Sequence, residues 1–262
     1  MATQHKTSTT VAKAFTILDA LASGGEGGTS LKTISRQLGM SKSTAHRYMT
    51  TLEELAVVER DDKDHFRLGL KLVELAATFL SDQNLHNVSA PFLHGLAAQT
   101  QETVHLAVPF ADEVVYIAKV DSSHAIRMAS HIGARIPMYC TSLGKVILAH
   151  YPADRVEEIM RAGLSARTPH TITSAESLRA ELERVRAQGY AIDDQENEIG
   201  VCCVGAPIFD YTSKVIGAIS ISGPASRMTM ERSLELAPLV RDAASGVSRR
   251  MGYPHARTSA DK

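Results

Sequence analysis

The chain has 262 residues, of which 44% are hydrophobic and 22% are charged, proportions typical of a globular protein rather than a disordered one. Its 28 Lys and Arg nearly balance its 29 Asp and Glu, so any nucleic-acid-binding surface must be a local feature. No apolar run approaches the ~20 residues of a membrane helix, and the first residues lack the apolar core of a signal peptide. Three cysteines, two of them adjacent, favour free thiols in a reducing cytoplasm.

The N-terminal segment shows a polar tail followed by helical spacing. Residues 1–8 are polar and are expected to be disordered. Apolar residues then recur at helical spacing from Thr9 to Ala22, and a glycine-rich run at 23–28 ends that helix. Ser30 is the expected N-cap of a short second helix.

A third helix and a hairpin complete this segment. Gly39 is expected to supply the left-handed residue that ends the second helix, and Ser41 caps the third. Two short β segments follow at 57–60 and 65–68, joined by an acidic turn. Three helices followed by a hairpin predict a winged helix-turn-helix over residues 9–69.

A change of pattern separates this segment from the rest of the chain. Apolar spacing predicts a linker helix over residues 70–86, and the polar stretch 81–87 marks a domain boundary. The elements expected beyond it are a hairpin at 105–110 and 114–120, a strand at 126–132, helices at 142–150, 154–162 and 174–188, a hairpin at 201–209 and 215–222, and a helix at 231–251. This order predicts an α+β domain with an antiparallel sheet over residues 87–254, followed by a tail at 255–262.

The helix at 174–188 has the clearest end signals. Thr173 and Glu176 match a capping box, in which the first side chain accepts from the backbone near the second. Gly189 follows the last helical residue and is expected to end the helix in a left-handed conformation.

The third helix carries the strongest indication of DNA binding. Between Ser30 and Thr50 the chain has four cations and no Asp or Glu, which is the local basic footprint that phosphate contacts need. The helix N-terminus also offers backbone N–H groups to a phosphate. A charged helix face that is merely solvated is the alternative. The expected DNA contacts are Lys32, Ser41, Lys42, Ser43, Thr44, His46, Arg47, Thr50, Lys63 and Arg67.

Four segments carry a family resemblance. They are Ser-Lys-Ser-Thr-Ala-His-Arg at 41–47, the run from Pro137 to Ala149, the run from Asp193 to Asp210, and Ile-Ser-Ile-Ser-Gly-Pro at 219–224. All four resemble the IclR family of transcription regulators, in family order. The resemblance implies a winged helix, a linker helix and a C-terminal effector domain of GAF-like architecture. It also implies double-stranded operator DNA as a partner, and homodimers commonly paired into tetramers.

The resemblance also implies a site for a small organic acid in the C-terminal domain. Backbone amides at Ser142 and Leu143 would hold the carboxylate, since a helix start is a ready anion site. The other implied or expected effector contacts are Asp193, Cys203, Ser220 and Ser222 at the polar end, with Met128 and Tyr139 in the wall. Arg127 is a further carboxylate partner or else a surface residue.

Each of these expected effector residues also has an alternative interpretation in which its role is only structural. A buried cysteine such as Cys203 is often a small hydrophobic residue, and alternating serines are often only the polar face of a strand. For Asp193 the alternative is a residue that only caps or turns the chain after Tyr190.

The effector and the sign of regulation remain open. The segments 126–128 and 132–135 look like those of repressors that respond to 2-keto-3-deoxygluconate, which favours a sugar acid. Repression relieved by the acid is the expectation, and activation is the alternative.

Two other classes of protein compete with a regulator. Cys203 with His105 or His131 and Asp193 has the residue types of a thiol enzyme, whereas a purely architectural DNA binder would sense no ligand. No catalytic residue is expected. No metal-ligand spacing or cofactor motif is present, so neither a metal nor a cofactor is predicted.

Overall fold

The computed structural model describes residues 9–24, 27–75, 85–126 and 128–254. The chain divides into two compact units, Met1–Asp82 and Gln83–Lys262. The tails expected at 1–8 and 255–262, the polar boundary up to residue 84, and Arg127 lie outside the described residues. Of the expected linker helix at 70–86, the described residues 71–75 are helical.

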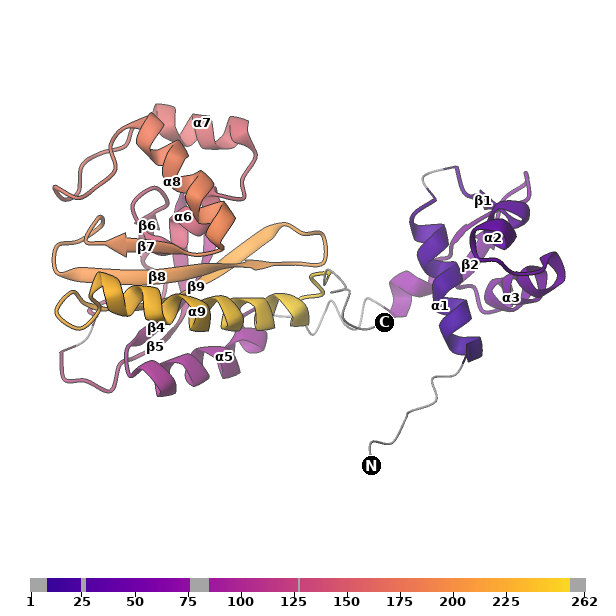
Figure 1. The fold of residues 1–262 in the computed structure, drawn as a ribbon, viewed down its shortest axis with the longest axis horizontal. Helices are drawn as coiled ribbons and strands as arrows, with labels where there is room; N and C mark the ends of the chain where they lie inside the picture. Colours follow the sequence, from indigo (N-terminus) through magenta and orange to yellow (C-terminus); the bar gives the residue numbers. More distant parts are fainter. Residues whose placement is uncertain (1–8, 25–26, 76–84, 127, 255–262) are drawn as a thin grey trace. The chain divides into compact units, whose positions relative to one another are not determined.

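The N-terminal unit is a winged helix-turn-helix, as the sequence predicts (Figure 1). Its elements are α1 (Thr9–Ala22), β1 (Thr29–Ser30), α2 (Leu31–Gln37), α3 (Lys42–Glu54), β2 (Val58–Arg60) and β3 (His65–Leu68). The sheet has the order β1-β3-β2, and β2 and β3 form the antiparallel wing. The short strand β1 was not expected, because two residues are too few to show a periodic pattern.

Local signals explain where these helices begin and end. Ser30 Oγ accepts a hydrogen bond from the backbone of Thr33 at 3.3 Å, and Ser41 Oγ accepts from Thr44 at 3.2 Å, so both predicted N-caps are confirmed. Gly39 has a φ of +59°, the left-handed conformation that a glycine adopts without strain. Apolar residues of the three helices and of β2 and β3 form one core, which contains Ile17, Leu21, Ile34, Met49, Leu52, Val58 and Phe66.

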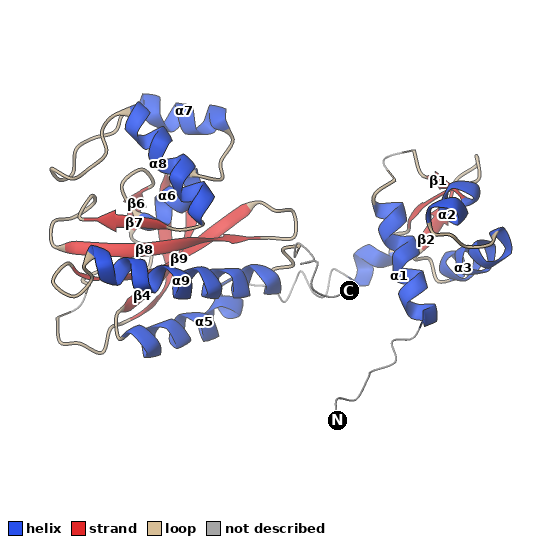
Figure 2. Cartoon of the chain, viewed as in Figure 1, coloured by secondary structure: helices blue, strands red, loops and turns tan. Residues whose placement is uncertain are grey.

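The C-terminal unit is an α+β domain built on one antiparallel sheet (Figure 2). Its elements are α5 (Leu85–Thr100), β4 (Thr103–Phe110), β5 (Glu113–Val120), β6 (Arg135–Pro137), α6 (Ser142–Leu148), α7 (Ala153–Ala162), α8 (Ala175–Gln188), β7 (Ala191–Asp194), β8 (Val201–Phe209), β9 (Val215–Pro224) and α9 (Met230–Arg250). The six strands have the order β6-β5-β4-β9-β8-β7.

Helices cover both faces of this sheet. α5 and α9 pack against one face, where apolar residues of β4, β8 and β9 join them in a core. α6, α7 and α8 lie over the opposite face around a second core that includes Leu143, Ile147 and Leu178 (Figure 1). α6 contacts β8 and β9 directly, and this contact positions the site described below.

The strand expected at 126–132 is wrong. The described residues there form a loop, and the short strand β6 follows it and pairs with β5. The apolar spacing is misleading because Ile126 and Ile132 are 72% and 59% exposed rather than packed on a sheet. Gly133, with a φ of +87°, then turns the chain into the pairing with Tyr116.

The capping box expected at Thr173 is also wrong by one residue. Ser174 is the N-cap of α8, and its Oγ accepts from the backbone of Ser177 at 3.1 Å. The C-terminal signal is confirmed, because Gly189 adopts the left-handed conformation with a φ of +77°.

Besides β1 and β6, two further elements were not expected from the sequence. α5 begins at Leu85, inside the segment assigned to the linker, and it contains Pro91. β7 is an edge strand of four residues that ends in two aspartates, a composition more typical of a turn.

Candidate effector cavity and DNA-binding surface

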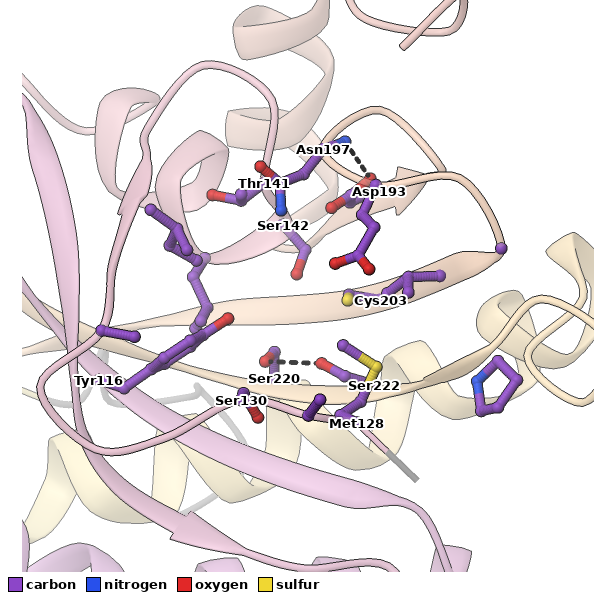
Figure 3. Close-up of a pocket in the computed structure, with 18 of the residues that line it drawn as sticks. Tyr116, Met128, Ser130, Thr141, Ser142, Asp193, Asn197, Cys203, Ser220 and Ser222 are labelled. Carbon is purple, nitrogen blue, oxygen red and sulfur yellow. Dashed lines mark hydrogen bonds between the residues drawn. The ribbon is translucent and has the colours of Figure 1, made fainter. Parts of the chain in front are cut away.

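A cavity of about 530 Å³ lies in the C-terminal unit between the sheet and the start of α6 (Figure 3). Its wall contains both polar and apolar side chains. The volume of the cavity is within the range of small-molecule sites. The lining residues are Tyr116, Ile126, Met128, Ala129, Ser130, His131, Ala134, Ile136, Thr141, Ser142, Leu143, Asp193, Asn197, Glu198, Gly200, Val201, Cys203, Ser220, Ser222 and Pro224.

Strand register brings the polar floor of the cavity together. Asp193 on β7 pairs with Cys203 on β8, which in turn pairs with Ser222 on β9, so three side chains form one row across the sheet. In the neighbouring row, Ser220 pairs with His105 on β4. Side chains alternate between the two faces of a strand, so the intervening apolar residues of β8 and β9 point into the opposite core.

Close packing brings α6 to this floor. A Cβ on Gly144 would lie 2.2 Å from the backbone of Met138, so only glycine permits this approach. Thr141 is the N-cap: its Oγ1 accepts from Gly144 N at 3.1 Å and donates to the carbonyl of Pro137 at 2.7 Å. The amides of Ser142 and Leu143 belong to the first turn, where backbone N–H groups have no intrahelical partner.

Asp193 contributes a carboxyl group to the cavity floor. It is 2% exposed, and its Oδ1 accepts from the backbone N–H groups of Glu196 at 2.8 Å and Asn197 at 3.4 Å. Burial, together with the Glu196 carboxylate, raises the pKa of Asp193 to about 7, although the Lys145 ammonium opposes the rise. Near neutral pH this carboxyl group can therefore accept or donate a hydrogen bond.

A histidine lies next to Ser220 and Ser222, the two serines of β9 in the cavity. His105 is fully buried, and its Nε2 lies 2.7 Å from Ser130 Oγ while its Nδ1 lies 3.4 Å from Ser222 Oγ. Its ring stacks on Tyr116 with centroids 4.4 Å apart. Burial, with a smaller effect of the Lys119 charge, lowers the pKa of His105 to about 3, so the imidazole is neutral.

A loop closes the other side of the cavity. Lys119 Nζ donates to the carbonyl oxygens of Met128 at 3.2 Å and Ser130 at 2.7 Å. These bonds hold the described residues 128–130 close to Ser220 and Ser222. Figure 3 shows this for the side chains of Met128 and Ser130.

Seven of the eight expected effector residues line this cavity, and Tyr139 does not. The Tyr139 hydroxyl donates to the carbonyl of Ser165 at 2.8 Å, and Tyr116 stands in the cavity wall instead. Sequence reasoning missed Tyr116, Ser130 and Asn197. Only strand alternation in β5 hints at Tyr116, since the next inward residue on that face is Val114.

The exposed face of α3 carries the expected DNA contacts. Ala45, Met49 and Leu52 are buried in the core of the N-terminal unit. The exposed side chains on the opposite face are Lys42, Ser43, His46, Arg47 and Thr50. Lys32 from α2 lines a shallow hollow beside α3 together with Lys42, His46 and Thr50.

The wing is less basic than its cations suggest. Arg67 lies 3.3 Å from Glu59, and Arg60 lies 2.7 Å from Asp64, so both guanidinium groups already have carboxylate partners. Lys63 is exposed within the acidic turn. Ser41 and Thr44 share the hydrogen bonds of the α3 cap.

Two models of known protein families match this chain over most of its length. Residues 10–62 match the IclR helix-turn-helix domain, and residues 77–249 match the C-terminal domain of the bacterial transcriptional regulator IclR. The chain belongs to the IclR family.

Individual relatives cover almost the full length of this IclR-family chain. It is 39% identical over 245 residues to the HTH-type transcriptional regulator KdgR of Escherichia coli (strain K12), covering 93% of this chain and 92% of the relative. It is 34% identical to the transcriptional repressor IclR of the same organism, covering 85% and 82%. The crystal structure of the Thermotoga maritima IclR superposes with a TM-score of 0.63 at 38% identity, covering 93% and 99%.

The family assignment establishes a DNA-binding transcriptional regulator with an effector-type C-terminal domain. The relatives are regulators rather than enzymes. Within the described residues, no helix combines the length and apolarity needed to cross a bilayer.

Proposed function

We propose that this IclR-family regulator represses an operon for the catabolism of a sugar acid or another small acid, and that the acid relieves repression by binding in the C-terminal cavity. The observation that carries this proposal is the cavity itself, where Asp193, Cys203 and two serines converge beside the first turn of α6. The similarity to KdgR at 39% identity favours the sugar-acid class among small acids.

The chemistry of the wall suggests how such a ligand is held. The amides of Ser142 and Leu143 would receive the carboxylate. Asp193, Ser220 and Ser222 would bind hydroxyl groups at the other end, because each has an oxygen that accepts a hydrogen bond. The apolar carbons would lie along the wall of Met128 and Tyr116, with Cys203 filling the floor.

The DNA contacts would come from α3. Lys42, Ser43, His46, Arg47 and Thr50 present hydroxyl, imidazole and cationic groups on one exposed face, suited to phosphates and base edges. A homodimer would place two such helices on a palindromic operator in the cytoplasm, with half-sites spaced by whole helical turns of about 34 Å. A dimer of dimers would follow the family pattern.

The mechanism would be a population shift. The acid would favour a placement of the winged helices that fits the operator poorly, and it shifts the equilibrium only by its difference in affinity between the two placements.

A two-stage experiment tests the proposal. Purified protein is first screened for thermal stabilisation by small carboxylates and sugar acids, with 2-keto-3-deoxygluconate as the first probe, because a bound ligand adds RT ln(1 + [L]/Kd) to stability. Positive acids are then titrated into a gel shift on the upstream region of the gene. The expected result is release of DNA by the wild type and loss of that response in Asp193→Ala, which still binds DNA.

The same experiment separates the alternatives. An acid that strengthens operator binding would indicate an activator, and a protein that no acid stabilises would be an architectural DNA binder. We expect no turnover of any acid, because burial raises the pKa of the Cys203 thiol well above its usual value and disfavours the thiolate that a nucleophile requires.

A further inference from the structure

A buried lysine lies directly behind the effector cavity. Lys145 is on α6, three residues after Ser142, and it is 1% exposed. Its Nζ donates to Glu181 Oε1 on α8 at 3.1 Å, to the carbonyl of Ile192 at 2.6 Å and to Glu196 Oε1. A fully buried ammonium is costly, so its presence here calls for a physical reason.

Two of the residues that Lys145 contacts lie on either side of Asp193 in the sequence. Ile192 immediately precedes Asp193, and Glu196 follows it by three residues. Glu196 also connects Lys145 to Asp193 directly, because the backbone N–H of Glu196 donates to Asp193 Oδ1 at 2.8 Å. One ammonium therefore holds the end of β7 and the following turn in the arrangement that aims Asp193 at the cavity.

We propose that Lys145 is a positioning residue of the effector site, which holds the Asp193 carboxylate in the geometry and charge state that accept a hydroxyl group of the bound acid. This inference rests on the proposed function. It assigns a role in ligand binding to a residue that does not itself line the cavity.

The charges around Asp193 show why one cation matters. The titratable groups that act on it or on its neighbours in the cluster are Lys145 from α6, Glu181 and Arg184 from α8, Arg167 from the segment before α8, Asp194 at the end of β7, Glu196 and Glu198 from the turn after β7, Cys202 and Cys203 from β8, Tyr116 from β5 and Cys140 from the turn before α6. Among the charges that act directly on Asp193, Glu196 raises its pKa and Lys145 lowers it. Removing the charge of Lys145 should therefore raise the pKa of Asp193, and removing the charge of Glu196 should lower it.

The pKa values of the two acidic partners of Lys145 shift in opposite directions. Burial raises the pKa of Glu196, whereas for Glu181 the charges of Lys145 and Arg184 outweigh burial and lower the pKa. Glu196 Oε2 is buried and has no hydrogen-bond partner in the described part of the chain. An unpaired buried oxygen costs free energy, so this part of the cluster does not add to stability.

A second set of contacts anchors the same turn without any charge. Thr168 Oγ1 donates to the carbonyl of Gln195 at 2.7 Å, and Thr171 Oγ1 donates to the carbonyl of Glu196 at 2.6 Å. Thr168→Val removes one of these main-chain anchors and leaves every charge in place, so it is a matched control for loss of structure.

The test measures the affinity of the full-length protein for 2-keto-3-deoxygluconate by calorimetry between pH 5.5 and 8.5, or for another acid found in the thermal screen. We compare the wild type with Lys145→Met, Glu196→Gln and Thr168→Val, after circular dichroism and operator binding confirm folding. Because the ionised Asp193 accepts the hydroxyl, affinity should fall as pH drops through the Asp193 pKa of about 7.

The variants should then separate by the midpoint of this pH profile. Lys145→Met is expected to move the midpoint up by about one pH unit, the scale of a nearby charge, and so to weaken binding about fivefold at pH 7. Glu196→Gln, which keeps an oxygen for Lys145, should move the midpoint down. Thr168→Val should weaken binding at every pH and leave the midpoint in place.

Each other outcome counts against the inference. Midpoints that stay fixed, or that move in the same direction in Lys145→Met and Glu196→Gln, would show that the cluster acts only as structure. If Lys145→Met does not fold, a midpoint in Glu196→Gln that fails to fall overturns the inference alone. A wild type that binds none of the acids would overturn the proposed function, and this inference with it.

Discussion

Replacing Asp193 with asparagine should stabilise the protein at alkaline pH. Asparagine keeps a carbonyl oxygen to accept from the backbone of Glu196 and Asn197, and it removes the charge that burial penalises. This substitution therefore separates the effect of Asp193 on the stability of the fold from its proposed role in binding the acid.

The magnitude follows from the pKa. The Asp193 carboxyl changes from an ordinary value of 3.8 to about 7 on folding, a rise of about 3 units, and each unit corresponds to about 1.36 kcal/mol. Between these two pH values the folded state binds more protons than the unfolded state, so the contribution of Asp193 to stability falls as pH rises. Asp193→Asn should match the wild type near pH 4 and exceed it by on the order of 4 kcal/mol above pH 8.

Urea unfolding followed by tyrosine fluorescence measures this difference. The chain has no tryptophan and 7 tyrosines, of which only Tyr48 lies in the N-terminal unit, so the signal reports mainly on the C-terminal unit. The reasoning is refuted if Asp193→Asn is less stable than the wild type at pH 8, or if the difference between them does not change with pH. A stabilised variant that has lost its response to the acid would show a residue kept for binding at a cost in stability.

Arg47→Ala should weaken operator binding and reduce the slope of log K against log salt concentration by about 0.9, the value for one phosphate contact, in gel shifts over a salt series; an unchanged slope would remove Arg47 from the interface. Gly144→Ala should lower the free energy of unfolding by about 3 kcal/mol or prevent folding, because its Cβ would meet the backbone of Met138 at 2.2 Å, and near-wild-type stability in urea would contradict this packing. Tyr116→Ala should weaken binding of the acid about tenfold while Tyr139→Phe changes it less than about twofold, and calorimetry that reverses this order would restore Tyr139 to the cavity.

Features encoded by neighbouring residues were accessible from the sequence. The bounds of α1, the N-caps Ser30 and Ser41, and the left-handed Gly39 and Gly189 all depend on hydrogen bonds or dihedral angles within one turn. The exposed face of α3 follows from helical periodicity alone. These features are local, so a short window of sequence contains all the groups that decide them.

Weak local signals misled the same approach. Apolar residues at 126–132 suggested a strand because their spacing is that of a half-buried strand, but a strand also needs a partner, and that partner belongs to residues 135–137. Sequence patterns and the family resemblance named seven of the residues that line the cavity, yet they could not show that Tyr139 points to Ser165 while Tyr116 lines the wall.

Strand register and contacts between distant segments were decided only by the tertiary structure. The row of Asp193, Cys203 and Ser222 exists because β7, β8 and β9 pair in one particular register, and no spacing along the chain encodes that pairing. Lys145 reads in the sequence as an ordinary helical lysine. Its burial against groups 36, 47 and 51 residues away is a product of the folded packing, because only there do α6, α8 and the turn after β7 meet.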